Sequence, residues 1–375
     1  MHGEGWGGEG LARTRTWETS SIGRARNNKP HAVGPRAVRA GAAKVRLCAE
    51  FPSRLPTIAM SSLICGSLAF DTITDFPGRF AEHILPDKVH MLNVAFLVPT
   101  LRREFGGCAG NIAYSLKLLG GEPLVLAALG EDGQDYQDRL DAFGISRAHV
   151  HVAPRTHTAQ AHIITDRDNN QITAFHPGAM SRAHEQAVPA VPGLRLGIIA
   201  PDGRQAMLDH AAQMAAAGLP FVFDPGQGLP MFDGEELRAF VRQASWVAVN
   251  DYEAAMLSER TGWSLDDIAT HVRGIVVTQG AQGCEVREGG AVVKVPGLQA
   301  ARVVDPTGCG DAFRGALLWA LEQGWSLADA SKLGNVLGAR KIAHAGPQNY
   351  SITLGEALAA LRQAYGEIST QATQA

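Results

Sequence analysis

The chain contains few cysteines, and none of them is paired in sequence. Five cysteines lie scattered among 375 residues without a C-x-x-C pair. Such spacing predicts neither a disulfide framework nor a structural zinc site, and it is typical of proteins that work in a reducing cytoplasm. The chain also lacks any apolar run approaching the roughly 18 residues that a transmembrane helix requires. We therefore expect a cytoplasmic protein without a membrane partner.

Common phosphate-binding and metal-binding motifs are absent as well. No G-x-x-x-x-G-K-[ST] occurs, which excludes a P-loop kinase, and the 13 histidines show no H-E-x-x-H or other paired metal spacing. The formal net charge is −3, but residues 1–59 hold ten Lys/Arg against four Asp/Glu, whereas the remainder holds 24 against 33. An acidic body argues against a nucleic-acid partner.

Residues 1–59 differ from the rest in composition. They are rich in Gly, Arg, Pro and Asn and show no apolar periodicity, so we expect a disordered extension, with Met60 as the native start. An arginine-rich targeting peptide is the alternative, because such peptides are also poor in acidic residues. The segment GEGWGG near the start matches G-x-G-x-x-G, but no strand precedes it, and we interpret the match as accidental.

Residues 60–370 alternate between short apolar runs and segments of helical periodicity. The first run, SSLICGSLAF, indicates one buried strand, and later runs such as LRLGIIAP and GIVVTQG lie between helical segments. Continuous apolar strands between helices are typical of a largely parallel sheet covered on both faces. We therefore predict an α/β fold with a central, mostly parallel sheet flanked by helices.

One stretch breaks this alternation. HTAQAHIITDRDNNQITAF has a period of two around an Asp-Asn-Asn turn, as a hairpin with one solvated face does. Together with Phe76–Val98, it predicts a small antiparallel lid formed by residues 72–100 and 155–178. Such a lid would exclude water from a reaction beneath it.

Polar and glycine-rich residues collect where the predicted strands end, which is where a doubly wound sheet binds its ligands. In Thr307-Gly308-Cys309-Gly310, glycines let backbone N–H groups converge before a helix, an arrangement that favours a bound anion. Asp311 would then act as a base toward a substrate hydroxyl. The alternative is that Asp311 only caps the helix. We interpret Cys309 as a small space-filling residue rather than a nucleophile.

A second glycine-rich turn, residues 106–111, also leads into a helix. A ligand can approach its glycines closely, and the Asn111 amide offers a donor and an acceptor to a polyol. A tight loop-to-helix entry is the alternative. Asp71, after the first strand, suits two vicinal hydroxyls, although an exposed loop carboxylate would look the same in sequence.

Asn250 and Glu253 lie three residues apart at the start of a predicted helix, and therefore on one face. They match a capping box. The functional alternative is that they orient a hydrated Mg²⁺ near nucleotide phosphates, because Mg²⁺ keeps much of its water shell.

The order of the motifs GGCAGN, NDYE, TQGAQG and DPTGCGDAF resembles that of the ribokinase-like (PfkB) sugar and nucleoside kinases. FPGRF and FHPGAM narrow the resemblance to bacterial adenosine kinases of the mycobacterial type. The resemblance covers nearly everything from Met60 onward. It implies a ribokinase-like fold with a β lid, a homodimer formed through the lid, and Mg²⁺-dependent transfer of the ATP γ-phosphoryl to the 5′-hydroxyl of adenosine. It also implies activation by a monovalent cation such as K⁺ in some members.

The resemblance further implies a role for individual residues. Asp311 corresponds to the base, with an anion hole formed by Gly308, Cys309 and Gly310. The nucleoside side corresponds to Ser67, Asp71, Gly107, Asn111, Phe175 and Gln227. The ATP side corresponds to Asn250, Thr278, Gly280, Gly283 and Arg314, with Asn250 and Glu253 orienting the metal through water and Arg314 balancing phosphate charge.

Three positions depart from the mycobacterial pattern. Ala161 stands where that pattern has a second stacking phenylalanine in the lid, Gly228 replaces a glutamine beside Gln227, and Met231 replaces an arginine. Stacking on an aromatic ring contributes ~1–3 kcal/mol per base, so these losses predict a more permissive purine nucleoside kinase that accepts inosine or guanosine. A sugar kinase for ribose or a fructose phosphate, or a catalytically silent nucleoside-binding protein, are the alternatives.

Overall fold

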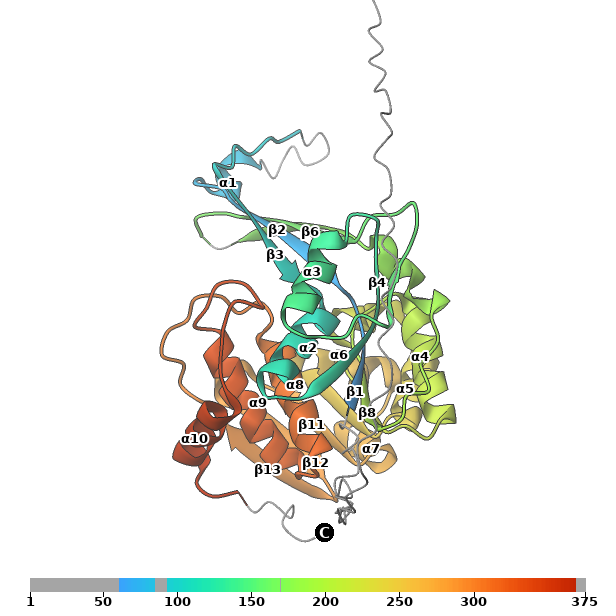
Figure 1. The fold of residues 1–375 in the computed structure, drawn as a ribbon. Helices are drawn as coiled ribbons and strands as arrows, with labels where there is room; N and C mark the ends of the chain where they lie inside the picture. Colours follow the sequence, from blue (N-terminus) through green and yellow to red (C-terminus); the bar gives the residue numbers. More distant parts are fainter. Residues whose placement is uncertain (1–60, 85–92, 169, 369–375) are drawn as a thin grey trace, which may run out of the picture. The chain divides into compact units, whose positions relative to one another are not determined.

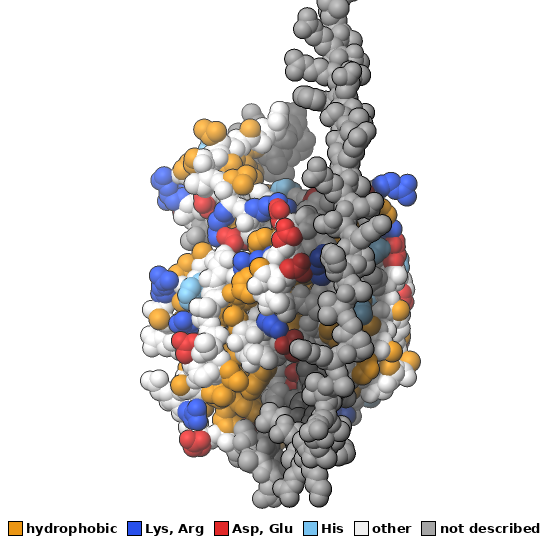
Figure 2. Space-filling model, viewed as in Figure 1, with side chains coloured by type: hydrophobic (Ala, Val, Ile, Leu, Met, Phe, Trp, Pro, Cys, Tyr) orange, Lys and Arg blue, Asp and Glu red, His pale blue; other side chains and the backbone are white. Residues whose placement is uncertain are grey.

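The computed structural model describes residues 61–84, 93–168 and 170–368 (Figure 1). The expectation of a disordered extension over residues 1–59 lies outside these residues. Within them, no helix is long and apolar enough to cross a membrane. On the face shown in Figure 2, side chains of both charge signs are interspersed, and neither sign forms a continuous patch.

A large sheet forms the centre of the described chain, with strand order β13-β12-β11-β10-β9-β8-β1-β4-β5. Its strands are β1 Ser61–Cys65, β4 Glu122–Leu129, β5 Val150–Val152, β8 Leu194–Ile199, β9 Phe221–Phe223, β10 Trp246–Asn250, β11 Gly274–Thr278, β12 Gly283–Glu288 and β13 Ala291–Pro296. Pairing is parallel from β5 to β11, whereas β12 pairs antiparallel with both β11 and β13 at the edge of the sheet. The predicted mostly parallel α/β sheet is confirmed.

Helices cover both faces of this sheet because successive strand residues point to opposite sides. Leu63 and Ile64 illustrate this, since they belong to two different buried clusters. The cluster around Ile64 includes side chains of α2 Cys108–Leu118, α3 Gln134–Ala142, α8 Cys309–Glu322, α9 Leu327–Lys341 and α10 Leu354–Tyr365. The cluster around Leu63 includes side chains of α4 Arg204–Ala216, α5 Gly234–Gln243, α6 Asp251–Thr261 and α7 Leu265–His271.

A smaller sheet lies apart from the large one, with strand order β3-β2-β6-β7 (Figure 1). Its strands are β2 Ala69–Asp75, β3 Thr100–Gly106, β6 Ala159–Thr165 and β7 Gln171–His176. The predicted hairpin is confirmed as β6 and β7, which pair antiparallel. The small sheet is mixed rather than antiparallel as we had expected, because β2 pairs parallel with β6. The stretch Phe76–Val98, which we had assigned to the lid, lies between β2 and β3. The described part of that stretch holds the short helix α1 Phe80–His83.

The apolar run SSLICGSLAF does not form one strand, as we had expected, but contributes to both sheets. β1 ends at Cys65 and β2 begins at Ala69. Between them, the Ser67 N–H donates to Pro201 O at 3.0 Å, and the chain leaves the large sheet. The sequence gives no sign of this change because the residues on both sides of it are buried.

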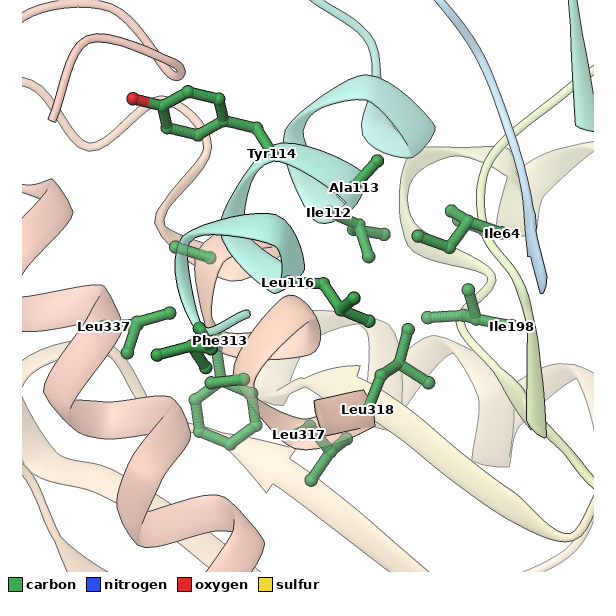
Figure 3. Close-up of a cluster of buried hydrophobic side chains, with 14 of the residues drawn as sticks. Ile64, Ile112, Ala113, Tyr114, Leu116, Ile198, Phe313, Leu317, Leu318 and Leu337 are labelled. Carbon is green, nitrogen blue, oxygen red and sulfur yellow. The ribbon is translucent and has the colours of Figure 1, made fainter. Parts of the chain in front are cut away.

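Helices α2 and α8 pack closely beneath the two glycine-rich turns. Figure 3 shows Leu116 of α2 beside Leu318 of α8, and Ile112 of α2 facing Ile64 of the sheet. The close approach depends on Gly315. A Cβ atom there would lie 2.6 Å from Ser115 Cβ and 2.8 Å from Ile112 O. This contact sets the separation of the helices that carry Asn111 and Asp311.

We expect Gly315→Ala to force α2 and α8 apart, at a cost of about 1–3 kcal/mol, because added volume in a close-packed core is destabilising. Thermal unfolding would show this as a lower Tm. Gly355→Ala is the matched control, because Gly355 is exposed on α10 and a Cβ there would meet no atom closer than 4.0 Å. Equal Tm values for the two variants would contradict the close contact.

Candidate active site

One cavity of about 750 Å³ lies at the carboxyl ends of the central strands, next to the small sheet. Of the residues selected from the sequence, its lining includes Ser67, Asp71, Gly107, Asn111, Phe175, Gln227, Asn250, Glu253, Thr278, Gly280, Gly308, Gly310, Asp311 and Arg314. Two selected residues do not line it. The Cys309 thiol lies 3.9 Å from Asp305 O, and Gly283 begins β12, where a Cβ would lie 2.1 Å from Val295 O.

Asp311 lies in the first turn of α8 but does not cap it. The N-cap position is Gly308, and no side chain caps the helix. Instead, the Asp311 carboxylate accepts a hydrogen bond of 2.8 Å from Asn111 Nδ2. Burial raises the pKa of Asp311 to about 6, although the Asn111 hydrogen bond and the charge of Arg314 oppose the rise. A carboxylate with such a pKa is ionised at neutral pH and can accept a proton.

The glycine turn before α8 adopts a conformation that only glycine accommodates. Gly308 has φ 77°, and a Cβ there would lie 2.6 Å from Pro347 Cβ. The Asp305 carboxylate holds the turn by accepting from the N–H of Thr307 at 2.9 Å and of Gly346 at 2.8 Å. The positive end of the 14-residue helix therefore meets the cavity at a fixed loop, which suits an anion.

The second glycine turn places α2 against the cavity. Gly107 has φ 85°, and a Cβ there would lie 2.6 Å from Ser67 O. Ser67 Oγ accepts from the Cys108 N–H at 3.1 Å and so satisfies the start of α2. Both ends of the Asn111 amide are engaged, because Nδ2 donates to Asp311 and Oδ1 accepts from Gln348 Nε2 at 3.0 Å. The turn is a tight helix entry and a cavity wall at once.

Asp71 belongs to a row of residues that crosses the small sheet. It pairs with Ala161 on β6, and Ala161 pairs with Phe175 on β7. Residues in register on neighbouring strands share one face, and all three line the cavity. Burial and the nearby Asp311 charge raise the pKa of Asp71 to about 6. Asp71 is therefore not an exposed loop carboxylate, and Phe175, 52% exposed, extends the same row outward.

Asn250 and Glu253 form the capping box of α6. Asn250 Oδ1 accepts from the Glu253 N–H at 2.8 Å, and the Glu253 carboxylate accepts from the Asn250 N–H and Nδ2. Within the described residues, no three His, Cys, Asp or Glu side chains gather as a metal site. A divalent cation would therefore fit here only through water and ligand phosphates, which is how Mg²⁺ is commonly held.

Arg314 lines the cavity and is held by a buried carboxylate. It is buried, and its guanidinium pairs with Asp224 through Nε at 2.5 Å and Nη2 at 2.8 Å. Nη1 donates to Gly310 O at 3.3 Å, and Glu253 lies 3.9 Å away. Arg314 thus braces the turn before α8, and its action on a phosphate stays a prediction.

The sequence analysis missed Gln348 and Tyr136, which lie behind Asn111. Both are buried, and Gln348 Nε2 donates to Tyr136 Oη at 2.9 Å. They are 212 residues apart and belong to none of the motifs. Only the fold brings these two uncharged side chains together.

Comparisons with known proteins cover most of the chain. The sequence profile of the pfkB family of carbohydrate kinases matches residues 81–354. Burkholderia thailandensis nucleoside kinase in complex with inosine is 51% identical, covering 82% of this chain and 98% of that one, with a TM-score of 0.75. The complex of the same enzyme with ADP-inosine is 52% identical, covering 84% of this chain and 98% of that one, with a TM-score of 0.74. Methanocaldococcus jannaschii nucleoside kinase is 26% identical, covering 81% of this chain and 98% of that one, with a TM-score of 0.74.

The raised pKa of Asp71 predicts a stability effect. With a pKa of about 6 against an ordinary 3.8, the folded protein binds more protons than the unfolded chain between these values, so ionisation of Asp71 lowers stability as pH rises through them. We expect Asp71→Asn to raise Tm at pH 8 by about 2–5 °C, and less at pH 4. Asp75→Asn, at the exposed end of the same strand, is the control. A Tm difference independent of pH would contradict this cause.

Proposed function

The chain belongs to the pfkB family of carbohydrate kinases, and we propose that it is an ATP-dependent nucleoside kinase that phosphorylates the 5′-hydroxyl of purine nucleosides, adenosine and inosine among them. The observation that carries this proposal is the meeting of three features in one cavity. The Asp311 carboxylate lies at the positive end of α8, Asp71 and Asn111 lie beside it, and the row ending at Phe175 extends away from it.

The proposed reaction uses Asp311 as the base. The 5′-oxygen of the nucleoside forms a bond to the γ-phosphorus of ATP while the bond from that phosphorus to the β-bridging oxygen breaks, and ADP leaves. Asp311 accepts the 5′-hydroxyl proton. The Gly308–Gly310 turn and the α8 N-terminus stabilise the transferring phosphoryl group, because their dipoles are fixed before the reaction. Asp71 and Asn111 orient the ribose hydroxyls.

ATP would lie on the side of the cavity formed by Thr278 and Gly280, beyond the glycine turn. Mg²⁺, when bound with the nucleotide, neutralises phosphate charge. Asn250 and Glu253 would act on it through water, because their side chains are already joined in the capping box. Gly283 supports this wall from behind rather than lining it. Replacing K⁺ by Na⁺ in the assays below tests the expected activation by a monovalent cation.

The nucleobase of the substrate would lie between the small sheet and the wall formed by Gln227, Gly228 and Met231. Phe175 offers one stacking ring, and its partner in register, Ala161, offers none. Gly228 adds no polar group opposite them. A wall with one ring and few polar side chains binds a purine without distinguishing an exocyclic amine from an exocyclic oxygen. This favours a kinase that accepts both adenosine and inosine. The similar nucleoside kinase whose structure is a complex with inosine supports the same substrate class.

The small sheet also carries apolar side chains that are exposed in the described part of the chain. Leu101 is 70% exposed and Ile172 is 40% exposed. We infer a homodimer formed through the lid, because pairing two such surfaces would bury this area. The molar mass in solution distinguishes a dimer from a monomer.

The first test is Mg²⁺/ATP turnover with adenosine, inosine, guanosine, ribose and fructose 6-phosphate. We expect purine nucleosides to be the substrates. Asp311→Asn should lower kcat by about 10²–10⁴-fold, because an amide cannot accept the proton, while calorimetry still detects inosine binding. Turnover of ribose or fructose 6-phosphate alone would replace the proposal by a sugar kinase. Binding without turnover in the unaltered protein would indicate a silent nucleoside-binding protein.

A second test concerns base choice. A Cβ at position 228 would meet the flexible ends of Met231 and Met207 at 3.1 and 3.4 Å, so a side chain fits after small adjustments. Gly228→Gln should raise the adenosine-to-inosine ratio of kcat/KM by about tenfold, because one new hydrogen bond to the exocyclic amine is worth ~1.4 kcal/mol. Gly228→Leu adds similar volume without an amide and should leave the ratio unchanged. A rise in both variants would point to volume alone.

A further inference from the structure

A chain of hydrogen bonds runs from the last residue of β3 to the Asp311 carboxylate. Tyr136 Oη donates to Gly106 O at 2.7 Å, and Gln348 Nε2 donates to Tyr136 Oη at 2.9 Å. The same nitrogen donates to Asn111 Oδ1 at 3.0 Å, and Asn111 Nδ2 donates to Asp311 Oδ2 at 2.8 Å. The chain thus joins the small sheet, α3, the segment after α9, and the starts of α2 and α8.

The donor and acceptor of every hydrogen bond in this chain are set by the Gly106 carbonyl oxygen at its far end from Asp311. A backbone carbonyl can only accept, so the single Tyr136 hydroxyl proton must point to Gly106 O. The Tyr136 oxygen must then accept from Gln348, which turns the nitrogen of the Gln348 amide toward it. The second proton of that nitrogen meets Asn111 Oδ1. With its oxygen occupied in this way, Asn111 presents Nδ2 to Asp311.

We propose that Gln348 and Tyr136 are positioning residues of the phosphoryl-transfer site, which fix the orientation of the Asn111 amide and thereby keep Asp311 a proton acceptor. The inference rests on the proposed function of Asp311 as the base. With the opposite Asn111 orientation, an amide oxygen would face the carboxylate, and only protonated Asp311 could bond to it. The fixed orientation therefore favours the ionised carboxylate.

The surroundings hold Gln348 rigidly enough for this role. It is 4% exposed, and its backbone oxygen accepts from Arg139 Nη2 at 2.6 Å. The neighbouring Pro347 packs against the Gly308 turn. Asn349 Nδ2 donates to Glu104 Oε2 at 2.7 Å, which fastens the same segment to β3.

Other groups also shift the pKa of Asp311, so a pH effect of a variant must be distinguished from their effects. Arg314 of α8 lowers its pKa, and Asp224 after β9 raises it. The thiol of Cys108 on α2 contributes a hydrogen bond that lowers it. Asp71 of β2 and Lys341 of α9 lie close enough to interact with its charge. None of these groups is altered in the variants below.

The experiment compares Gln348→Met, which has similar length and no donor, with the unaltered protein across pH 5 to 9. Loss of the fixed Asn111 amide should raise the pKa of Asp311 above about 6. We expect the acidic limb of kcat/KM to move up by roughly one pH unit, which corresponds to a loss of about fivefold at pH 6 and almost none at pH 8. Tyr136→Phe should move it in the same direction by less.

Tyr350→Phe is the matched control. It removes the hydrogen bond from Tyr350 Oη to Ser115 Oγ in the same segment without touching the chain to Asp311. It should lower Tm and leave the acidic limb in place. Should Gln348→Met fail to fold, Tyr136→Phe decides. A fall in kcat/KM that is equal at all pH values would overturn the proposal.

A substrate-free measurement separates this inference from the proposed function. NMR titration of ¹³C-labelled aspartate carboxyls, with the Asp311 signal assigned by its loss in Asp311→Asn, reports the midpoint directly. A higher midpoint in Gln348→Met supports the positioning role even if no nucleoside is phosphorylated, in which case only the kinase proposal fails. An unchanged midpoint contradicts the positioning role, whatever the turnover.

Discussion

The ion pair between Arg314 and Asp224 is the interaction on which the site depends. Both side chains are buried, and the two hydrogen bonds join the first turns of α8 to the end of β9. A buried charge without a partner costs several kcal/mol, so each member requires the other. The guanidinium also lies near the carboxylates of Asp311 and Glu253. The positive charge of Arg314 therefore lowers the pKa of both carboxylates at the floor of the cavity, against the opposing charge of Asp224.

Around this pair, the site combines rigid and open parts. The floor is made of glycine turns, helix starts and strand ends, whose backbone contacts leave little freedom. The roof is a four-stranded sheet, and the part of the Asp71 row that lines the cavity consists of Asp71, Ala161 and the partly exposed ring of Phe175. This division suits a reaction in which the phosphoryl group must be positioned strictly, whereas the nucleobase of the substrate can vary.

The sequence could predict those parts of the site that lie in contiguous motifs. Three such parts are the turn before Asp311, the turn before Asn111 and the alternating lid hairpin. Each is recognisable from the pattern of one short contiguous stretch. Asn250 and Glu253 showed the limit, because the same spacing serves a capping box and a metal site, and the structure shows the capping box. Gln348 and Tyr136 lay beyond prediction, since their roles depend on partners distant in the chain. The division of SSLICGSLAF between two sheets was equally invisible, because all its residues are apolar or small.

That division has a consequence for how the chain can vary in length. Only residues 66–68 separate β1, in the large sheet, from β2, in the small one. Side chains alternate along a strand, so the insertion or deletion of one residue in this link would turn Asp71 to the opposite face of the small sheet. A change of two residues would keep the face but slide Asp71 out of its row with Ala161 and Phe175. The length of this link therefore sets the position of Asp71 in the site.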